Sequence, residues 1–382
     1  MLLVNCLTHL VHDGLNDALN VFFPIWQAQF ALTFTEVGLL RTLVSGTMAS
    51  FQMPAGLAAN RWGEVRMILA GTVLVSLGAI GYGFTSGLFS LAFLLALGGV
   101  GSSVQHPLAS TLVTKAYPDT KERRTALGTL NFSGDIGKLT FPALAAFIIA
   151  LSDWPSATRI LGFISLLAAG VFYLATRGMI PDGNNSAERK ASAPTGWGWC
   201  GSTPFLALLA IGIIDSATRG GFIVFFPFLL QSKGAGVLTV GLALSLTFAG
   251  GATGKFLCGM LATRLGVLKT VIVTESLTAI AIWGMVALPL DSMLVLAPIL
   301  GLALNGTSSV LYGSVPELVA EEHYNQAFAF FYTLLIGAGA VSPIIFGFAG
   351  DVLGIGNALS LVGVMALLTV PLTVPLRGKV AH

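Results

Sequence analysis

Residues 56–66 read GLAANRWGEVR, and residues 259–269 read GMLATRLGVLK. Each stretch has a glycine, an arginine and a second glycine at equivalent places, and each lies between two long apolar runs. The tripeptide FFP recurs with the same offset, at 22–24 and at 225–227. Repeats this far apart and in register indicate that the chain is a duplication of a helical membrane unit.

The composition indicates that lipid, rather than water, surrounds most of the chain. Of the 382 residues, 55% are hydrophobic and 9% are charged, and the mean hydropathy is +0.85. A soluble protein carries about 25% charged residues. The three cysteines show no paired spacing, so the sequence predicts neither a disulfide framework nor a metal site. The first apolar segment contains His9 and Asp13 and lacks a cleavage site, so we expect a retained helix rather than a signal peptide.

Twelve apolar segments are long enough to cross a hydrocarbon core of about 30 Å as helices. They cover 2–30, 36–58, 67–86, 88–114, 125–150, 156–179, 202–231, 236–261, 268–288, 292–316, 325–349 and 355–376. The longest polar break, residues 181–201, contains GNNS and predicts a flexible linker. We therefore expect an all-α polytopic membrane protein with six-helix bundles at 1–180 and 202–382, related by pseudo-two-fold symmetry.

The lysines and arginines predict which loops face the cytoplasm. Most of the 19 basic residues fall in alternate loops and in the C-terminal tail, whereas the other loops and their edges hold only Lys233 and Arg159. Basic residues concentrate on the cytoplasmic side of membrane proteins. We expect both termini and the linker in the cytoplasm, and the protein as a monomer in a bacterial inner membrane.

The two repeated turns resemble the G-x-L-x-D-R-x-G-x-K/R signature of the major facilitator superfamily. The residues that carry the resemblance are Gly56, Asn60, Arg61, Gly63 and Arg66 in the first turn and Gly259, Arg264, Gly266 and Lys269 in the second. Asn60 and Thr263 stand where the family has an aspartate that helps to lock one conformational state. Such a latch is therefore weakened or built from other residues, or the turns serve only tight packing and orientation. With twelve helices and a central linker, the resemblance covers the whole chain and implies secondary transport by alternating access.

Two polar elements are similar to those of the fosmidomycin-resistance group of exporters. HLVHD at 9–13 lies in the first helix and GSSVQHP at 101–107 in the fourth, where that group has His-x-x-Asn-Asp-like and Gly-Ser-x-x-x-His-Pro elements. The resemblance implies proton-driven export of a small, anionic compound. Helix five carries only part of the Gly-Pro-rich signature of drug–proton antiporters, so the direction of transport stays open.

The first helix carries a polar stripe that a lipid-facing helix would not have. At about 100° per residue the stripe covers less than half of the circumference. Its members are Asn5, His9, His12, Asp13, Asn16, Asp17 and Asn20. Asp13 and Asp17 lie one turn apart, and both repulsion and burial disfavour the charged form of a carboxyl group. Either acid, or His12, is therefore a candidate proton carrier, unless the stripe is only a structural seam.

Two more helices place an acid and a base near mid-span. Asp135 and Lys138 are three residues apart, with Asn131 on the same face, and Asp215 and Arg219 are four apart. A charge at the bilayer centre costs about 2.5–3.5 kcal/mol on insertion scales. In one interpretation, the two charges of each pair only neutralise each other so that the helix can insert into the membrane. In the other, the pairs belong to an exchangeable network in which substrate or proton competes for one partner. In the network, both acids are candidate proton carriers.

Four cations within the helices predict an anionic substrate. They are Arg41, Lys138, Arg219 and Lys255. Such groups bind carboxylates, phosphates or phosphonates, and arginine suits bidentate binding. The number of these cations equals the number of aspartates in the candidate proton sites, so the cations could simply balance the negative charge of the aspartates. Further candidates for substrate contacts are Asn16, His106, Asn131, Asn305 and Tyr312. Glu275, in the ninth helix, has no role in this scheme.

The sequence shows no phosphate-cradling loop, no nucleophile–base constellation and no cluster of metal ligands. We therefore expect no enzyme, no cofactor, no metal and no nucleic-acid partner; the partners are a small molecule, protons and the bilayer. The favoured function is proton-coupled export of a small organic anion. The alternatives are proton-symport uptake of such an anion, and a receptor or lipid-handling membrane protein without proton coupling.

Overall fold

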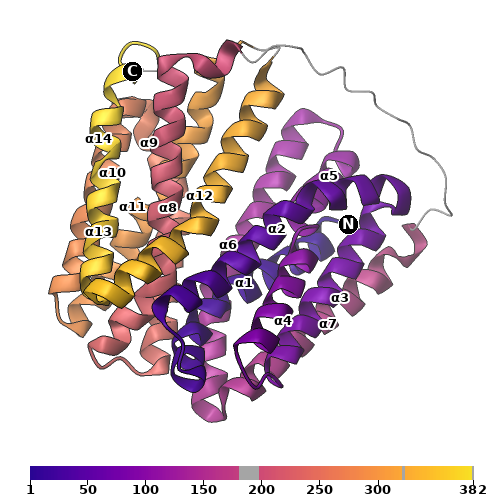
Figure 1. Cartoon of the computed structure of the whole chain (residues 1–382). Helices are drawn as coiled ribbons and strands as arrows, with labels where there is room; N and C mark the ends of the chain where they lie inside the picture. Colours follow the sequence, from indigo (N-terminus) through magenta and orange to yellow (C-terminus); the bar gives the residue numbers. More distant parts are fainter. Residues whose placement is uncertain (180–197, 321–322, 381–382) are drawn as a thin grey trace. The chain divides into compact units, whose positions relative to one another are not determined.

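The computed structural model describes residues 1–179, 198–320 and 323–380, whose regular structure is helical throughout, without a strand (Figure 1). The α-helices are α1 (Leu2–Phe30), α2 (Phe34–Trp62), α3 (Glu64–Tyr82), α4 (Leu88–Ser102), α5 (Gln105–Ala116), α6 (Thr120–Leu151), α7 (Trp154–Thr176), α8 (Thr203–Ser232), α9 (Val237–Leu265), α10 (Val267–Ala287), α11 (Leu290–Leu318), α12 (Tyr324–Leu353), α13 (Ile355–Leu367) and α14 (Thr369–Leu372). Short 3₁₀ helices are η1 (Arg177–Met179), η2 (Gly198–Gly201) and η4 (Val374–Leu376). The predicted linker, 181–201, lies outside the described residues up to position 197.

Ten spans within the described residues are long and apolar enough to cross a membrane, by length and composition. The helices α1 and α2 are 29 residues long and cover two further expected spans, but they are not among the ten. Both helices carry charged and amide side chains along their length, and these side chains lower the mean hydropathy of the two helices. The structure thus confirms an all-helical membrane fold and supports ten of the twelve expected spans.

Two of the expected spans are interrupted. α4 ends at Ser102 and α5 begins at Gln105, inside the span expected at 88–114. Pro107 has no amide hydrogen, so it cannot donate the helical hydrogen bond to the carbonyl group of residue 103. The break places His106 in the first turn of α5. The span expected at 355–376 is divided in the same way among α13, α14 and η4, where two prolines occur.

The described chain folds as two compact units. The first contains the described residues of 1–32, 40–189 and 236–245, drawn mostly in indigo to magenta, and the second contains those of 33–39, 190–235 and 246–382, drawn mostly in rose to yellow (Figure 1). In the first, α1 packs along α6, and α3 packs against α7 and α4. In the second, α8 packs along α12, and α10 packs against α13 and α11. The same pairs of spans therefore meet within each unit, as a duplicated helical fold predicts.

Glycines let α1 and α6 approach closely. A Cβ atom at Gly137 would overlap the backbone carbonyl oxygen of Leu10. A Cβ atom at Gly134 would lie 2.6 Å from Oδ2 of Asp13. Because only a residue without a side chain fits at these positions, the two helices can approach with their backbones in contact. This approach brings the polar side chains of α6 within reach of Asp13.

Gly137→Ala is expected to destabilise the protein by about 2–3 kcal/mol, because the added methyl group must push α1 away from α6. Gly128→Ala on the same helix is the matched control, since nothing lies within 4 Å of a Cβ atom there. This control should leave stability unchanged or raise it slightly. Thermal unfolding of both variants in detergent measures the difference. Equal melting temperatures would show that α1 and α6 do not depend on this contact.

The repeated turns have the same backbone conformation. Gly63 has φ 83° and Gly266 has φ 82°, a region that favours glycine, and each residue precedes the helix that follows its turn. Cβ atoms at Gly56 and Gly259 would meet nothing within 4 Å, so the close packing considered for these turns does not occur at these two positions. The polar residues that carry the family resemblance in these turns are exposed: Asn60, Arg61, Arg66, Arg264 and Lys269.

Candidate functional site

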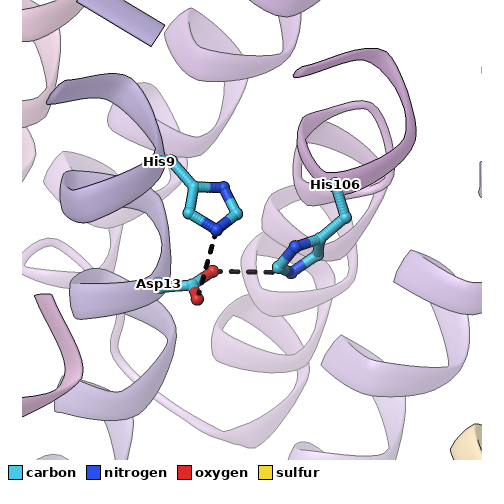
Figure 2. A group of neighbouring side chains, drawn as sticks. All are labelled: His9, Asp13 and His106. Carbon is cyan, nitrogen blue, oxygen red and sulfur yellow. Dashed lines mark ion pairs between the residues drawn. The ribbon is translucent and has the colours of Figure 1, made fainter. Parts of the chain in front are cut away.

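A cluster of titratable side chains surrounds Asp13 in the first unit (Figure 2). Nε2 of His106, in the first turn of α5, lies 3.4 Å from Oδ1 of Asp13, and Nε2 of His9, one turn earlier on α1, lies 3.8 Å from Oδ2. The two imidazole rings meet edge to face, with centroids 5.0 Å apart. The two histidine-containing elements noted in the sequence thus converge on one carboxyl group.

Lys138 on α6 completes the cluster, and it has a second, closer acid partner besides the predicted one. Its Nζ lies 3.2 Å from Oδ2 of Asp13 and 4.0 Å from Oδ1 of Asp135. The sequence predicted Asp135 as the partner because the two residues share a helix. The shorter contact runs instead between helices, because the glycines of α6 admit α1 so closely. Lys138 therefore ties α6 to α1.

The cluster is closed on one side and open on the other. Asp13 is buried, with 7% of its side chain exposed, and His9 and His12 are buried as well. The side chains of His106 and Lys138 are 44% and 30% exposed. A buried anion thus faces two accessible nitrogen-bearing groups, so an entering anion meets Lys138 and His106 before Asp13.

Further along α1, the predicted groups Asn16, Asp17 and Arg41 lie together. Arg41 on α2 donates through Nη1 to the backbone oxygen of Asn16 at 3.0 Å and to its Oδ1 at 3.3 Å. Asp17 is buried, within electrostatic range of Lys138 and Arg41. A pocket in the same unit is lined by Asn16 and His12, together with Tyr82 and Ser102 among its polar residues. Two members of the polar stripe therefore face a pocket inside the protein.

Three members of the cluster also have the arrangement of metal ligands. The ligand atoms of His9, Asp13 and His106 all lie within 4.8 Å of one another. Imidazole and carboxylate groups suit several divalent ions. The ammonium group of Lys138, however, already lies against the same carboxylate. A second cation there would meet that positive charge at close range, so the electrostatics favour anions over metal ions.

The second unit contains the predicted pair of Asp215 and Arg219 on α8. Nη2 of Arg219 donates to Oδ2 of Asp215 at 3.0 Å, and Nη1 donates to Oγ of Ser308 on α11 at 3.3 Å. The Asp215 side chain is 2% exposed and that of Arg219 is 25% exposed. Glu275 on α10, which had no role in the sequence scheme, is buried and lies within electrostatic range of Asp215 and Arg219. The pair is therefore part of a larger group that contains a second acid.

Other predicted substrate residues lie outside these two clusters or are held by neighbours. Asn131 is exposed and makes no hydrogen bond among the residues the structure describes. The side-chain amide of Asn305 donates to the backbone carbonyl oxygen of Gly301 within α11. The backbone of Lys255 accepts a hydrogen bond from Ser309. None of these contacts is itself evidence of a substrate site.

Tyr312 lies at the edge of the second cluster. Its ring stacks on Tyr332 of α12, with centroids 4.5 Å apart and an interplanar angle of 17°. Tyr332 is 48% exposed. Helical spacing in the sequence gives no sign of such a stacked pair between α11 and α12.

The sequence matches known transporters along its whole length. The sequence model of the Major Facilitator Superfamily matches residues 6–214 and 208–381. The probable sulfoacetate transporter SauU of Cupriavidus necator is 23% identical, over 99% of this chain and 96% of its own. Monocarboxylate transporter 11 of Homo sapiens is 24% identical, over 89% and 74%. The fosmidomycin resistance protein of Escherichia coli is 22% identical, over 92% and 83%, which agrees with the resemblance noted in the sequence.

Solved structures agree on the fold. The nucleoside transporter NupG has a TM-score of 0.78 at 11% identity and covers 96% of this chain and 97% of its own. A bacterial homologue of the human lysosomal transporter Spinster, inward-facing and unoccupied, has a TM-score of 0.77 at 17% identity, over 98% and 94%. With a family match along nearly all of its length and this fold, the chain belongs to the Major Facilitator Superfamily and is a multi-pass membrane transporter of small molecules, not an enzyme.

Proposed function

We propose that the protein couples the movement of a small organic anion to that of protons. The observation that carries the proposal is the cluster at Asp13. There Lys138 pairs with a buried carboxylate and is itself partly exposed, so a substrate can reach it. An anion that binds Lys138 and His106 competes directly with Asp13. The names of two relatives, a probable sulfoacetate transporter and a monocarboxylate transporter, support a small acid as substrate.

Charge alone couples the anion to a proton. When an anion takes Lys138, Asp13 loses its nearest fixed cation, and a buried carboxylate without a counterion favours the protonated form. Protonation of Asp13 in turn frees Lys138 for the anion. Each ligand therefore strengthens the binding of the other, as thermodynamic linkage requires. His9 and His106 touch the same carboxylate and provide a path for the proton.

This linkage favours co-transport of anion and proton, which gives uptake under an inward proton gradient. The sequence favoured export instead, and the fosmidomycin resistance protein among the relatives supports that second candidate. Export by exchange requires that proton and substrate exclude each other at one site. We retain the predicted topology, with both termini in the cytoplasm of a bacterial cell and the protein as a monomer in its inner membrane.

Proteoliposomes that contain labelled sulfoacetate on one side test the proposal. With acid outside and neutral buffer inside, the wild-type protein is expected to accumulate external sulfoacetate, and a protonophore should abolish the accumulation. Accelerated loss of internal sulfoacetate under the same gradient would instead establish exchange and export. Sulfoacetate movement that ignores the pH gradient in both arrangements would contradict proton coupling and favour the alternative of a membrane protein without it.

A further inference from the structure

An apolar groove on the first unit has no part in the proposed function. It has a volume of about 250 Å³ and runs between α2 and α3, over the junction of α4 with α5. Its walls are formed by Phe51, Pro54 and Ala58 on α2 and by Met67, Ala70 and Leu74 on α3. Its one polar lining side chain, Ser103, donates to the backbone oxygen of Val100. The groove therefore suits a hydrocarbon chain rather than a polar solute.

The floor of the groove is formed where α3 and α4 approach each other closely. A Cβ atom at Gly71 would overlap Cγ2 of Val104, and one at Gly101 would lie 2.8 Å from the carbonyl oxygen of Gly71. Met67 and Leu74 are seven residues apart, so the groove follows α3 for about 10 Å. Phe51, on the wall, is 44% exposed. The groove is thus elongated, parallel to the helices and open to the surface of the unit.

The equivalent helices of the second unit pack closely at this place. By the offset of the two repeated turns, Phe51 and Ala55 correspond to Gly254 and Cys258 on α9. A Cβ atom at Gly254 would overlap the carbonyl oxygen of Leu302 on α11, and one at Gly306 of α11 would overlap Sγ of Cys258. The duplicated fold therefore does not require a groove, and the open space is particular to the first unit.

Two arginines lie at one end of the groove. Arg61 is three residues after Ala58 and seven after Pro54, so it shares their face of α2. Arg66 is four residues before Ala70, on the same face of α3. Both arginines are exposed. The apolar walls thus end beside two guanidinium groups.

This end of the groove is positively charged and has the character of a membrane interface. Glu64, the acid of the turn, is paired with Lys115 on α5, so its charge is already balanced and the two arginines leave a positive excess. No side chain caps the first turn of α3 after Gly63, and uncapped helix amides favour anions. Trp62 is 54% exposed, as is typical of tryptophan at the level of lipid headgroups.

We propose that the groove binds one molecule of an anionic phospholipid. One acyl chain lies between α2 and α3, and the phosphate group contacts Arg61 and Arg66, whose planar guanidinium groups match phosphate oxygens. A zwitterionic lipid carries a cation in its headgroup that is repelled by the arginines, so the groove selects the anionic lipid. This inference does not depend on the substrate or on proton coupling.

Native mass spectrometry of the purified protein with added phosphatidylglycerol tests the charged end. The wild-type protein is expected to bind the first phosphatidylglycerol molecule at least about tenfold more tightly than phosphatidylcholine with the same acyl chains. Arg61→Gln combined with Arg66→Gln should remove this preference. Arg264→Gln combined with Lys269→Gln is the matched control, since it changes the equivalent exposed residues of the second turn, and it should keep the preference. The same preference in both double variants would overturn the proposal.

A second pair of variants tests the acyl chain. Ala70→Phe fills the groove from an exposed position and should weaken phosphatidylglycerol binding about tenfold, which corresponds to the loss of about two buried methylene groups. Leu77→Phe, at an exposed position of α3 outside the lining, is the control and should bind as the wild type does. Inorganic phosphate at the same concentration should not displace the lipid. Displacement by phosphate, or wild-type binding in Ala70→Phe, would show an anion site without a lipid groove and would contradict the proposal.

Discussion

Lys138→Ala is expected to abolish anion transport and to lower the free energy of unfolding by about 2–4 kcal/mol. Removal of one partner of a buried ion pair typically costs about 3–5 kcal/mol, because the other charge stays buried without compensation. We expect a smaller loss of stability than this typical cost because Lys138 is partly exposed and two histidines also contact Asp13. Transport fails for a separate reason, since the amine is the accessible cation of the cluster.

A double variant separates the two effects. Asp13→Asn combined with Lys138→Ala removes both charges, so most of the lost stability should return while transport stays absent. Lys121→Ala is the matched control, an exposed lysine near the start of the same helix. It should change neither property. Thermal unfolding and sulfoacetate uptake measure both. A double variant as unstable as Lys138→Ala would show that the loss came from packing rather than from an unpaired charge.

The second large effect is expected at Arg219. Arg219→Lys keeps the charge but loses the planar fork that now contacts both Asp215 and Ser308, so affinity for sulfoacetate should fall about tenfold, or 1.4 kcal/mol. Arg219→Ala should weaken it further, by about 10- to 100-fold, because a hydrogen bond to a charged group contributes about 1.5–3 kcal/mol. Calorimetric titration of the purified variants measures these changes.

Stability should follow a different order from affinity in this series. Arg219→Ala leaves two buried acids without a cation, so the variant should be less stable than Arg219→Lys. Asp215→Ala together with Arg219→Ala removes one acid and the cation at once, and stability should recover while binding does not. Equal affinity in all variants would mean that Arg219 and Asp215 only hold helices together, and the anionic substrate would lose its support from the second unit.

The features that depend on one helix were predictable. Asp215 and Arg219 are four residues apart, and helix geometry alone places such side chains on one face. The repeated turns identified the duplication, because Gly63 and Gly266 mark the same backbone conformation in each copy. The break between α4 and α5 lies beside Pro107, which cannot continue the helical hydrogen-bonding pattern, although the sequence predicted one uninterrupted span there.

The features that depend on two helices were not predictable from spacing. Lys138 has one acid three residues away and another on a distant helix, and nothing in the sequence says which helix is nearer. Glu275 remained without a role for the same reason, since the charged groups within electrostatic range of it, Asp215 and Arg219, lie on α8. A signal for Glu275 did exist, because Thr270, Thr274 and Thr278 place a polar face on α10 beside it. That face indicates a polar neighbour but does not identify it.

The contact between α1 and α6 constrains how new substrate ranges can evolve in this protein. Positions 134 and 137 tolerate no added atom, so the scaffold that presents Asp13 is closed to variation. His106, on the accessible side, carries no such restriction. Libraries that vary position 106 should therefore yield folded proteins with altered selectivity far more often than libraries directed at the glycines. Sequence divergence among descendants of this chain should accumulate in the same uneven way.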